Sequence, residues 1–161
     1  MNKTYFLFAV IALGVLGLGI VFAGAGFLTY IDWASALVIL FTTAALLVCS
    51  FRLREIGSYF AAAFRGRGAD TSTLKKGIGF FLAMQRYLII SAVLATMIGI
   101  IALLSVLGDP TYVSKGLALA LLSILYAVTL ILVVALPFRT SLERKLAEAE
   151  GFAGTAQQGS A

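Results

Sequence analysis

The fold is decided by two uncharged stretches, residues 87–108, YLIISAVLATMIGIIALLSVLG, and residues 116–138, GLALALLSILYAVTLILVVALPF. They contain 22 and 23 residues. A helix that rises about 1.5 Å per residue needs about 20 residues to cross the hydrocarbon core of a bilayer. Buried helices of soluble proteins are usually shorter and carry a polar face. The two stretches therefore predict two transmembrane helices.

Two further apolar stretches precede them, within residues 5–28 and 33–51. Of the 161 residues, 61% are hydrophobic and 12% are charged, whereas a soluble domain carries roughly 25% charged residues. This composition excludes an ordinary water-soluble enzyme. We expect an all-α membrane protein with four transmembrane helices, which form one membrane domain over residues 1–150.

The chemistry available to the chain is limited. It has no histidine and a single cysteine, Cys49, which excludes an intrachain disulfide and a His/Cys metal site within one chain. No nucleophile–base pair is present. We therefore expect neither an enzyme nor a cofactor.

The Lys and Arg residues predict the orientation. Eleven of the twelve lie before the first span, between residues 52 and 86, or after residue 138, and only Lys115 lies on the opposite side. The positive-inside rule therefore places both termini and the 52–86 loop in the cytoplasm. The connections at residues 28–33, which include Asp32, and 108–115 are expected outside. The basic residues indicate topology and contact with anionic lipid, and not nucleic-acid binding.

The N-terminus has some features of a signal peptide, because Lys3 precedes an apolar run and residues 23–25 resemble a cleavage site. The apolar run is much longer than the roughly 7–15 residues of a signal peptide. We therefore expect a retained helix.

The cytoplasmic segments show three patterns. Residues 52–64 have the spacing of an amphipathic helix, which we expect to continue the second span along the membrane surface. One of residues 71–73 is expected to cap a helix that runs into the third span. Pro137 is expected to distort or end the helix of the fourth span, either as a simple stop or as a hinge at a moving cytoplasmic end. A charged helix at 139–150 and a disordered tail at 151–161 follow.

The interior of the predicted spans contains small residues and hydroxyls but no Asp, Glu, Lys, Arg or His. Small or hydroxyl residues recur on one helical face in each of the last two spans: Ala92, Thr96 and Gly99, and Gly116, Ala120, Ser123 and Ala127. Such stripes allow close helix packing, and this is their common role. A second interpretation is a narrow lining that meets a helix of another polypeptide, with Thr96 and Ser123 as its hydroxyls. Both interpretations remain open at this point.

Several short motifs resemble the MotA/TolQ/ExbB family of proton channels. Residues 120–127, ALLSILYA, followed by Pro137, are similar to the last membrane helix of that family, and residues 95–99, ATMIG, resemble its Gly-Thr-x-x-Gly motif. The outer loop at 107–110, LGDP, and the beginning of the second span at 31–35, IDWAS, are also similar. Together the motifs extend over most of residues 14–146.

The resemblance implies the ring subunit of a complex driven by the proton-motive force. In the family, five copies surround two membrane helices of a single-span MotB/ExbD-like partner, whose membrane aspartate carries the proton. Carried over to this chain, the resemblance implies a homopentamer in which the third and fourth spans line the proton path. The implied lining residues are Ala92, Thr96, Gly99, Ala120, Ser123 and Ala127.

Two features depart from the family pattern. The 52–86 loop is much shorter than the cytoplasmic domain of MotA proteins, and the expected proline is absent at the start of the third span, where residues 86–90 read RYLII. A role in driving a flagellar rotor is therefore not implied. The alternatives are a non-transporting membrane scaffold or assembly factor with four spans and, against the absence of an intramembrane charge, a small secondary transporter.

Overall fold

The computed structural model describes residues 3–22, 24, 30–64, 70–105 and 110–158, and these residues form helices without any strand. The elements are α1 (Lys3–Phe22), α2 (Trp33–Ser50), α3 (Leu53–Phe64), α4 (Thr71–Leu104), α5 (Pro110–Leu130), a π-helical segment η2 (Ile131–Ala135) and α6 (Leu136–Gln158). The all-helical class expected from the sequence is confirmed.

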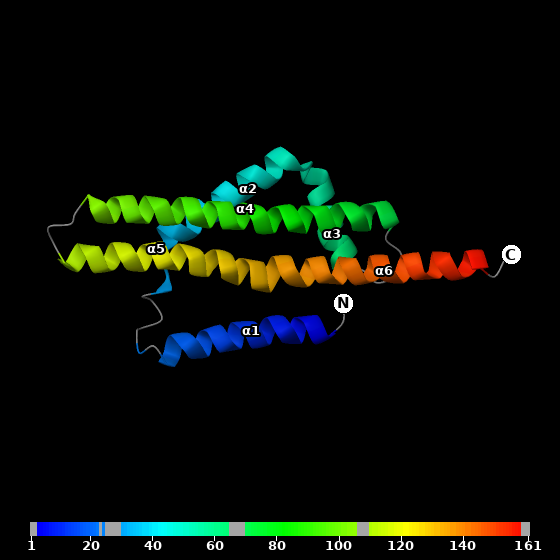
Figure 1. The fold of residues 1–161 in the computed structure, drawn as a ribbon, viewed down its shortest axis with the longest axis horizontal. Coiled ribbons are helices and arrows are strands. Elements are labelled where there is room, and N and C mark those ends of the chain that lie inside the picture. Colours follow the sequence, from blue (N-terminus) through cyan, green and yellow to red (C-terminus); the bar gives the residue numbers. More distant parts are fainter. Residues whose placement is uncertain (1–2, 23, 25–29, 65–69, 106–109, 159–161) are drawn as a thin grey trace.

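Two long helical elements run side by side in opposite directions and organise the molecule (Figure 1). One is α4. The other is the continuous helix formed by α5, η2 and α6, which extends from residue 110 to residue 158. On one side, α2 and α3 pack against this pair, and α1 lies against η2 and α6.

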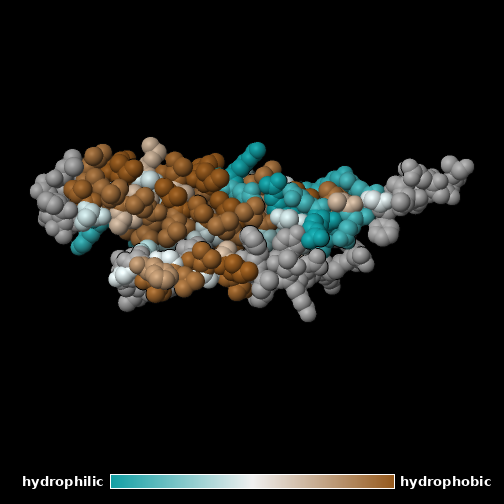
Figure 2. All heavy atoms as spheres, turned by 60° about the horizontal axis from the view of Figure 1, so that its bottom comes forward, coloured by the Kyte–Doolittle hydropathy of each residue, from teal (hydrophilic) through white to brown (hydrophobic). Residues whose placement is uncertain are grey.

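One end of the long pair is apolar and the other is charged (Figure 2). We call the part of the pair that contains residues 87–104 and 110–138 the apolar end, and the part that contains residues 71–86 and 139–158 the charged end. Three of the described helices are long and apolar enough to cross a membrane: α2, α4 and the helix that begins in α5. These three support a membrane protein. The remaining expected span, 5–28, corresponds to α1, whose apolar part Val10–Phe22 is shorter, while residues 23 and 25–28 lie outside the described residues.

α2 and α3 are separate helices, so the prediction that the second span continues into the amphipathic segment is wrong. Phe51 is extended, with φ −132° and ψ 145°, and this conformation ends α2. The helix predicted at 52–64 is present as α3. Its apolar face, which we expected to lie on the membrane, packs against α4 and α6, because Tyr59, Ala62 and Ala63 are buried there.

An aromatic cluster forms the core of the charged end. Ring contacts with centroids 5.0–6.5 Å apart connect Phe51, Tyr59, Phe60, Phe64, Phe80, Phe81 and Phe138. Lys145 fastens α3 to α6, because its Nζ donates hydrogen bonds to the carbonyls of Ala62 and Ala63, at 2.7 and 2.8 Å. These carbonyls belong to the last turn of α3, where a cation is favourable.

α4 begins at Thr71 and continues to Leu104, which confirms the expectation that a helix starting near residues 71–73 runs into the third span. The prediction that one of residues 71–73 caps this helix is wrong, because these residues lie in its first turn. The residue at the N-cap position is Asp70, and it makes no side-chain capping hydrogen bond. The expected 35-residue loop therefore contains α3 and the first turns of α4.

Of the two outcomes expected at Pro137, the helix is distorted there but does not end. The helix continues through Pro137, and the turn before it widens into η2, where the N–H of Leu136 donates to the carbonyl of Ile131. The wider turn accommodates a ring that would otherwise clash with the preceding turn. α6 then extends to Gln158, so residues 151–158 are helical where we expected disorder, and residues 159–161 lie outside the described residues.

Candidate functional site

The small residues of the last two predicted spans meet in the interface between α4 and α5. Ala92, Ala120, Ser123 and Ala127 are buried, and Thr96 and Gly99 are half-buried. The backbones come close at two glycines. A Cβ on Gly99 would lie 3.4 Å from the backbone of Ala120, and one on Gly116 would lie 3.3 Å from the Cα of Leu103. The stripes thus allow close packing of the two helices.

The two hydroxyls differ in their surroundings. Thr96 Oγ1 donates to the carbonyl of Ala120 on α5, at 3.2 Å, and so links the helices. Ser123 Oγ donates to the carbonyl of Leu119 in its own helix, at 3.2 Å, and Ser123 is only 1% exposed. Of the two, Thr96 is the residue that also borders a groove on the surface of the helix pair.

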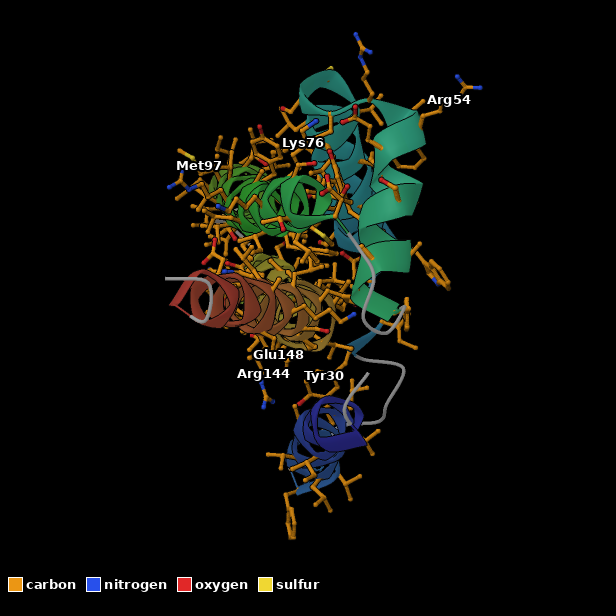
Figure 3. All side chains as sticks on the ribbon, turned by 90° about the vertical axis from the view of Figure 1, so that its right-hand side faces the viewer. Tyr30, Arg54, Lys76, Met97, Arg144 and Glu148 are labelled. Atoms are coloured by element: carbon orange, nitrogen blue, oxygen red, sulfur yellow. The ribbon has the colours of Figure 1, made fainter. Side chains whose placement is uncertain are left out.

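This open groove of about 300 Å³ follows the pair over the apolar end. It is lined by Ile89, Ala92, Val93, Thr96, Met97, Ile124, Ala127, Val128 and Ile131. Figure 3 shows Met97 on the side of α4 that faces away from α3. We call this feature the apolar groove. Three of the six residues predicted to line a path, Ala92, Thr96 and Ala127, border it, whereas Gly99, Ala120 and Ser123 lie in the helix interface.

α2 covers a different face of α4 and is held there by hydroxyl contacts. Thr43 Oγ1 donates to Ser91 Oγ at 3.1 Å, and both residues are buried. Ser50 Oγ and Tyr87 Oη share a hydrogen bond of 2.7 Å. These contacts fix α2 against the middle of α4, next to the charged end.

The beginning of α2 is attached to the last turns of α5. Tyr126 Oη accepts a hydrogen bond from the N–H of Asp32, at 2.7 Å, and donates one to the carbonyl of Tyr30, at 2.5 Å. The Asp32 carboxylate accepts from the N–H groups of Ala34 and Ser35 and caps α2. Tyr126 lies eleven residues beyond Lys115, which is about 16 Å along the helix.

Asp32 therefore lies nearer to the charged end than Lys115 does, although both residues are expected outside. The reason is that α2 crosses the pair obliquely, because its beginning contacts Tyr126 on α5 and its end contacts Tyr87 on α4. Hydropathy alone could not show this depth. The signal that was available is the tyrosine in the middle of an apolar span, since a Tyr hydroxyl in such a place needs a partner.

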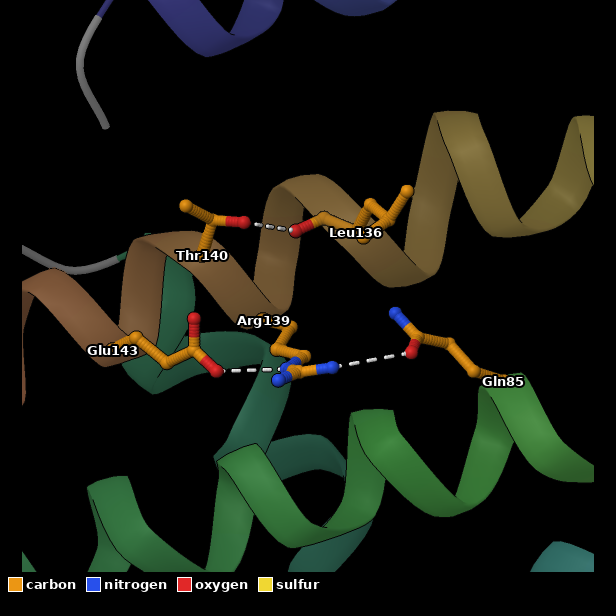
Figure 4. Close-up of polar contacts among 5 residues, drawn as sticks. All are labelled: Gln85, Leu136, Arg139, Thr140 and Glu143. Atoms are coloured by element: carbon orange, nitrogen blue, oxygen red, sulfur yellow. Dashed lines mark hydrogen bonds and ion pairs between the residues drawn. The ribbon is translucent and has the colours of Figure 1, made fainter.

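A polar cluster lies at the charged side of the apolar groove. Arg139 Nε donates to Glu143 Oε1 at 2.7 Å, and Arg139 Nη1 donates to Gln85 Oε1 at 3.4 Å (Figure 4). Gln85 and Arg139 are 54 positions apart in the sequence. Gln85 could not be predicted as a site residue, because a single uncharged polar residue next to Arg86 gives no pattern.

Metal-ligating groups do not gather in the described part of the chain: no three His, Cys, Asp or Glu side chains are close enough to hold an ion. Comparison with protein-family models gives no match, and comparison with curated proteins gives none.

Proposed function

We propose that this chain is the ring subunit of a complex in a bacterial inner membrane that uses the proton-motive force. In this proposal several copies, five by resemblance, surround the helices of a single-span MotB/ExbD-like partner. The partner supplies an aspartate, and the ring supplies the wall past which that aspartate moves. Both termini of the chain are cytoplasmic.

The observation that carries the proposal is the apolar groove. It lies on a face of the α4–α5 pair that α2 and α3 leave open, and Thr96 is the one hydroxyl residue among its nine lining residues. None of the nine is acidic. A proton path along this face therefore needs a titrating group from another polypeptide, which is the role of the partner.

The long helix pair supports coupling to a process outside the membrane. α4 and the α5–η2–α6 helix each continue from the apolar end into the charged end without interruption. A tilt of the pair at the groove would therefore move the charged end as well. The energy available is about 2.3 kcal/mol for each proton that crosses 100 mV.

The proposal is tested by co-expressing the chain with a MotB/ExbD-like protein and measuring proton uptake into vesicles. Thr96→Val is expected to lower the partner-dependent flux about tenfold, the equivalent of one charge-assisted hydrogen bond of about 1.5 kcal/mol. Thr129→Val is the matched control, because Thr129 Oγ1 bonds only the carbonyl of Leu125 in its own helix and is not part of the groove. Equal flux in the wild type and Thr96→Val would remove the groove from the mechanism.

A non-transporting scaffold or assembly factor is the second candidate. The observation in its favour is that both predicted path hydroxyls already make hydrogen bonds within the chain. It predicts no proton flux with any partner, and a number of copies unrelated to five. Native mass spectrometry of the complex extracted in detergent separates the two candidates by copy number and by the presence of a second polypeptide.

A further inference from the structure

The side-chain amide of Gln85 has a fixed orientation. An arginine guanidinium has only donors, so Gln85 must turn its Oε1 toward Arg139 Nη1. The Nε2 group is thereby directed to the opposite side. In Figure 4 it points toward the turn of the helix that carries Leu136.

Gln85 Nε2 is buried and has no hydrogen-bond partner among the described residues. A buried amide donor without a partner is destabilising, because it has lost its hydrogen bonds to water. Native structures rarely leave such a donor unsatisfied, and ordered water is a common partner.

The helix opposite Gln85 has an acceptor without its usual partner. Pro137 has no N–H, so the carbonyl one turn earlier, in η2, cannot receive the hydrogen bond that an ordinary residue would donate. Waters insert into helices at such places. An orphaned donor on α4 and a freed carbonyl in η2 thus occur at the same level of the helix pair.

This place connects the apolar groove with the charged end. Ile89 is the groove residue of α4 nearest the charged end, and Gln85 follows it by one helical turn. On the other helix the groove residue nearest the charged end is Ile131, where η2 begins. Beyond Gln85 the chain of polar contacts continues through Arg139 to Glu143, whose side chain is 41% exposed.

We propose that Gln85 Nε2 and the carbonyl freed by Pro137 hold a water molecule at the charged side of the apolar groove. Arg139 and Glu143 connect this water to the aqueous phase. The water site does not depend on the proposed function. Its use as the exit through which protons leave the groove rests on that function.

The water is detected by solid-state NMR of the full-length ¹⁵N-labelled chain in liposomes, through magnetisation transfer from water to the Gln85 side-chain amide. Gln85→Leu identifies the signal among the three glutamines of the chain. The backbone amide of Leu88, a buried residue one turn away, is the internal reference. We expect transfer to the Gln85 amide to be several times faster than transfer to Leu88.

Two proline variants test the acceptor. Pro137→Ala restores an N–H to the helix, so the freed carbonyl regains its partner and transfer to Gln85 falls to the level of Leu88. Pro110→Ala is the matched control and leaves transfer unchanged, because Pro110 begins α5, where the N–H has no intrahelical partner in any case. The proposal is overturned if the wild-type Gln85 amide behaves like Leu88, or if Pro137→Ala retains the wild-type rate.

The exit role is tested separately in the partner-dependent flux assay, where Gln85→Leu is expected to lower the flux about tenfold. Wild-type flux in this variant would overturn the exit role and leave the water site in place. Absence of flux in the wild-type complex with its partner would contradict the proposed function, and the NMR result would still decide the water site.

Discussion

The two ends of the long helix pair are held together by different means. At the apolar end, α4 and α5 meet through Gly99, Gly116 and Ala120, and the hydroxyl of Thr96 bridges the two helices. At the charged end, large aromatic side chains such as Phe80 and Phe81 fill the space between α3, α4 and α6. The same two helices therefore change their packing from small to large residues along their length.

Packing by small residues suits a helix pair in lipid, and packing by large aromatic residues suits one in water. In lipid, moving a Leu or Phe from acyl chains into a protein gains little, so helices associate through close backbone contact and hydrogen bonds. In water, each buried aromatic ring removes a large apolar area from the solvent and stabilises the fold. The packing thus changes along α4 at the same place as the charges.

The largest effect is expected at the charged end, for Phe80→Ala. Phe80 is 1% exposed and contacts the rings of Phe51, Tyr59, Phe60 and Phe81. Loss of the ring should lower the free energy of unfolding by about 3–5 kcal/mol. The measurement is thermal unfolding in detergent, followed by near-ultraviolet circular dichroism.

Phe41→Ala is the control for this variant, since Phe41 is 70% exposed on α2 and faces the surroundings of the apolar end. We expect a change below about 1 kcal/mol. Equal destabilisation by the two variants would contradict the assignment of the aromatic cluster to an aqueous core.

The second effect concerns the apolar end, where Gly116→Ala should separate α4 from α5. The new Cβ would lie 2.9 Å from the Cβ and 3.3 Å from the Cα of Leu103, so the backbones must move. Overpacking of this kind costs about 1–3 kcal/mol. Unfolding in detergent measures the loss.

Gly79→Ala provides the matched control for the glycine variant. A Cβ at Gly79 meets nothing within 4 Å, and alanine favours a helix over glycine by about 0.5–1 kcal/mol. This variant should therefore be slightly stabilised. If Gly116→Ala is stabilised by the same amount, the close approach of the two helices is wrong.

The sequence predicts the parts of the fold that depend on local pattern. Hydropathy locates α2, α4 and the helix that begins in α5, and the spacing of apolar residues in 52–64 predicts α3. The small residues at 92–99 and 116–127 identify the faces on which α4 and α5 meet. In each case the relevant signal lies within a few turns of one helix.

The features that could not be predicted depend on residues far apart in the sequence. Pro137 reads locally as a helix end, yet packing of the flanking turns on α4 and α1 carries the helix through it as η2. The contact of Arg139 with Gln85 and that of Tyr126 with the beginning of α2 arise only when the helices are side by side. The pattern of charges along the sequence contains no information on how deep a residue lies in the helix pair.

The third effect is a pH dependence of the charged end, in which Tyr59 is the titrating group. Burial, together with the hydrogen bond from Tyr59 Oη to Glu55 Oε2 at 2.8 Å, raises the pKa of Tyr59 above its ordinary value of 10.0. The folded state therefore favours the neutral phenol. Its contribution is complete below pH 10 and is lost as the pH rises through the raised pKa.

Tyr59→Phe removes this dependence. At pH 7 the variant should lose about 1 kcal/mol, the net value of one hydrogen bond, and above pH 10 its unfolding should become less sensitive to pH than that of the wild type. Unfolding in detergent at a series of pH values from 8 to about 12 measures both the loss of stability and its change with pH. If the stability of the wild type and that of Tyr59→Phe change with pH in the same way above pH 10, Tyr59 is not the group that causes the pH dependence.

The smallest effect is expected for the ion pair between Lys75 Nζ and Glu150 Oε1, which are 3.0 Å apart. Their side chains are 60% and 55% exposed, so water and salt weaken the attraction, and pairs of this kind contribute about 0–1 kcal/mol. Glu150→Gln should therefore change the free energy of unfolding by less than about 0.5 kcal/mol at 0.15 M salt. A loss comparable to that of Phe80→Ala would mean that charges, and not aromatic rings, join α4 to α6, and would reverse the contrast between the two ends.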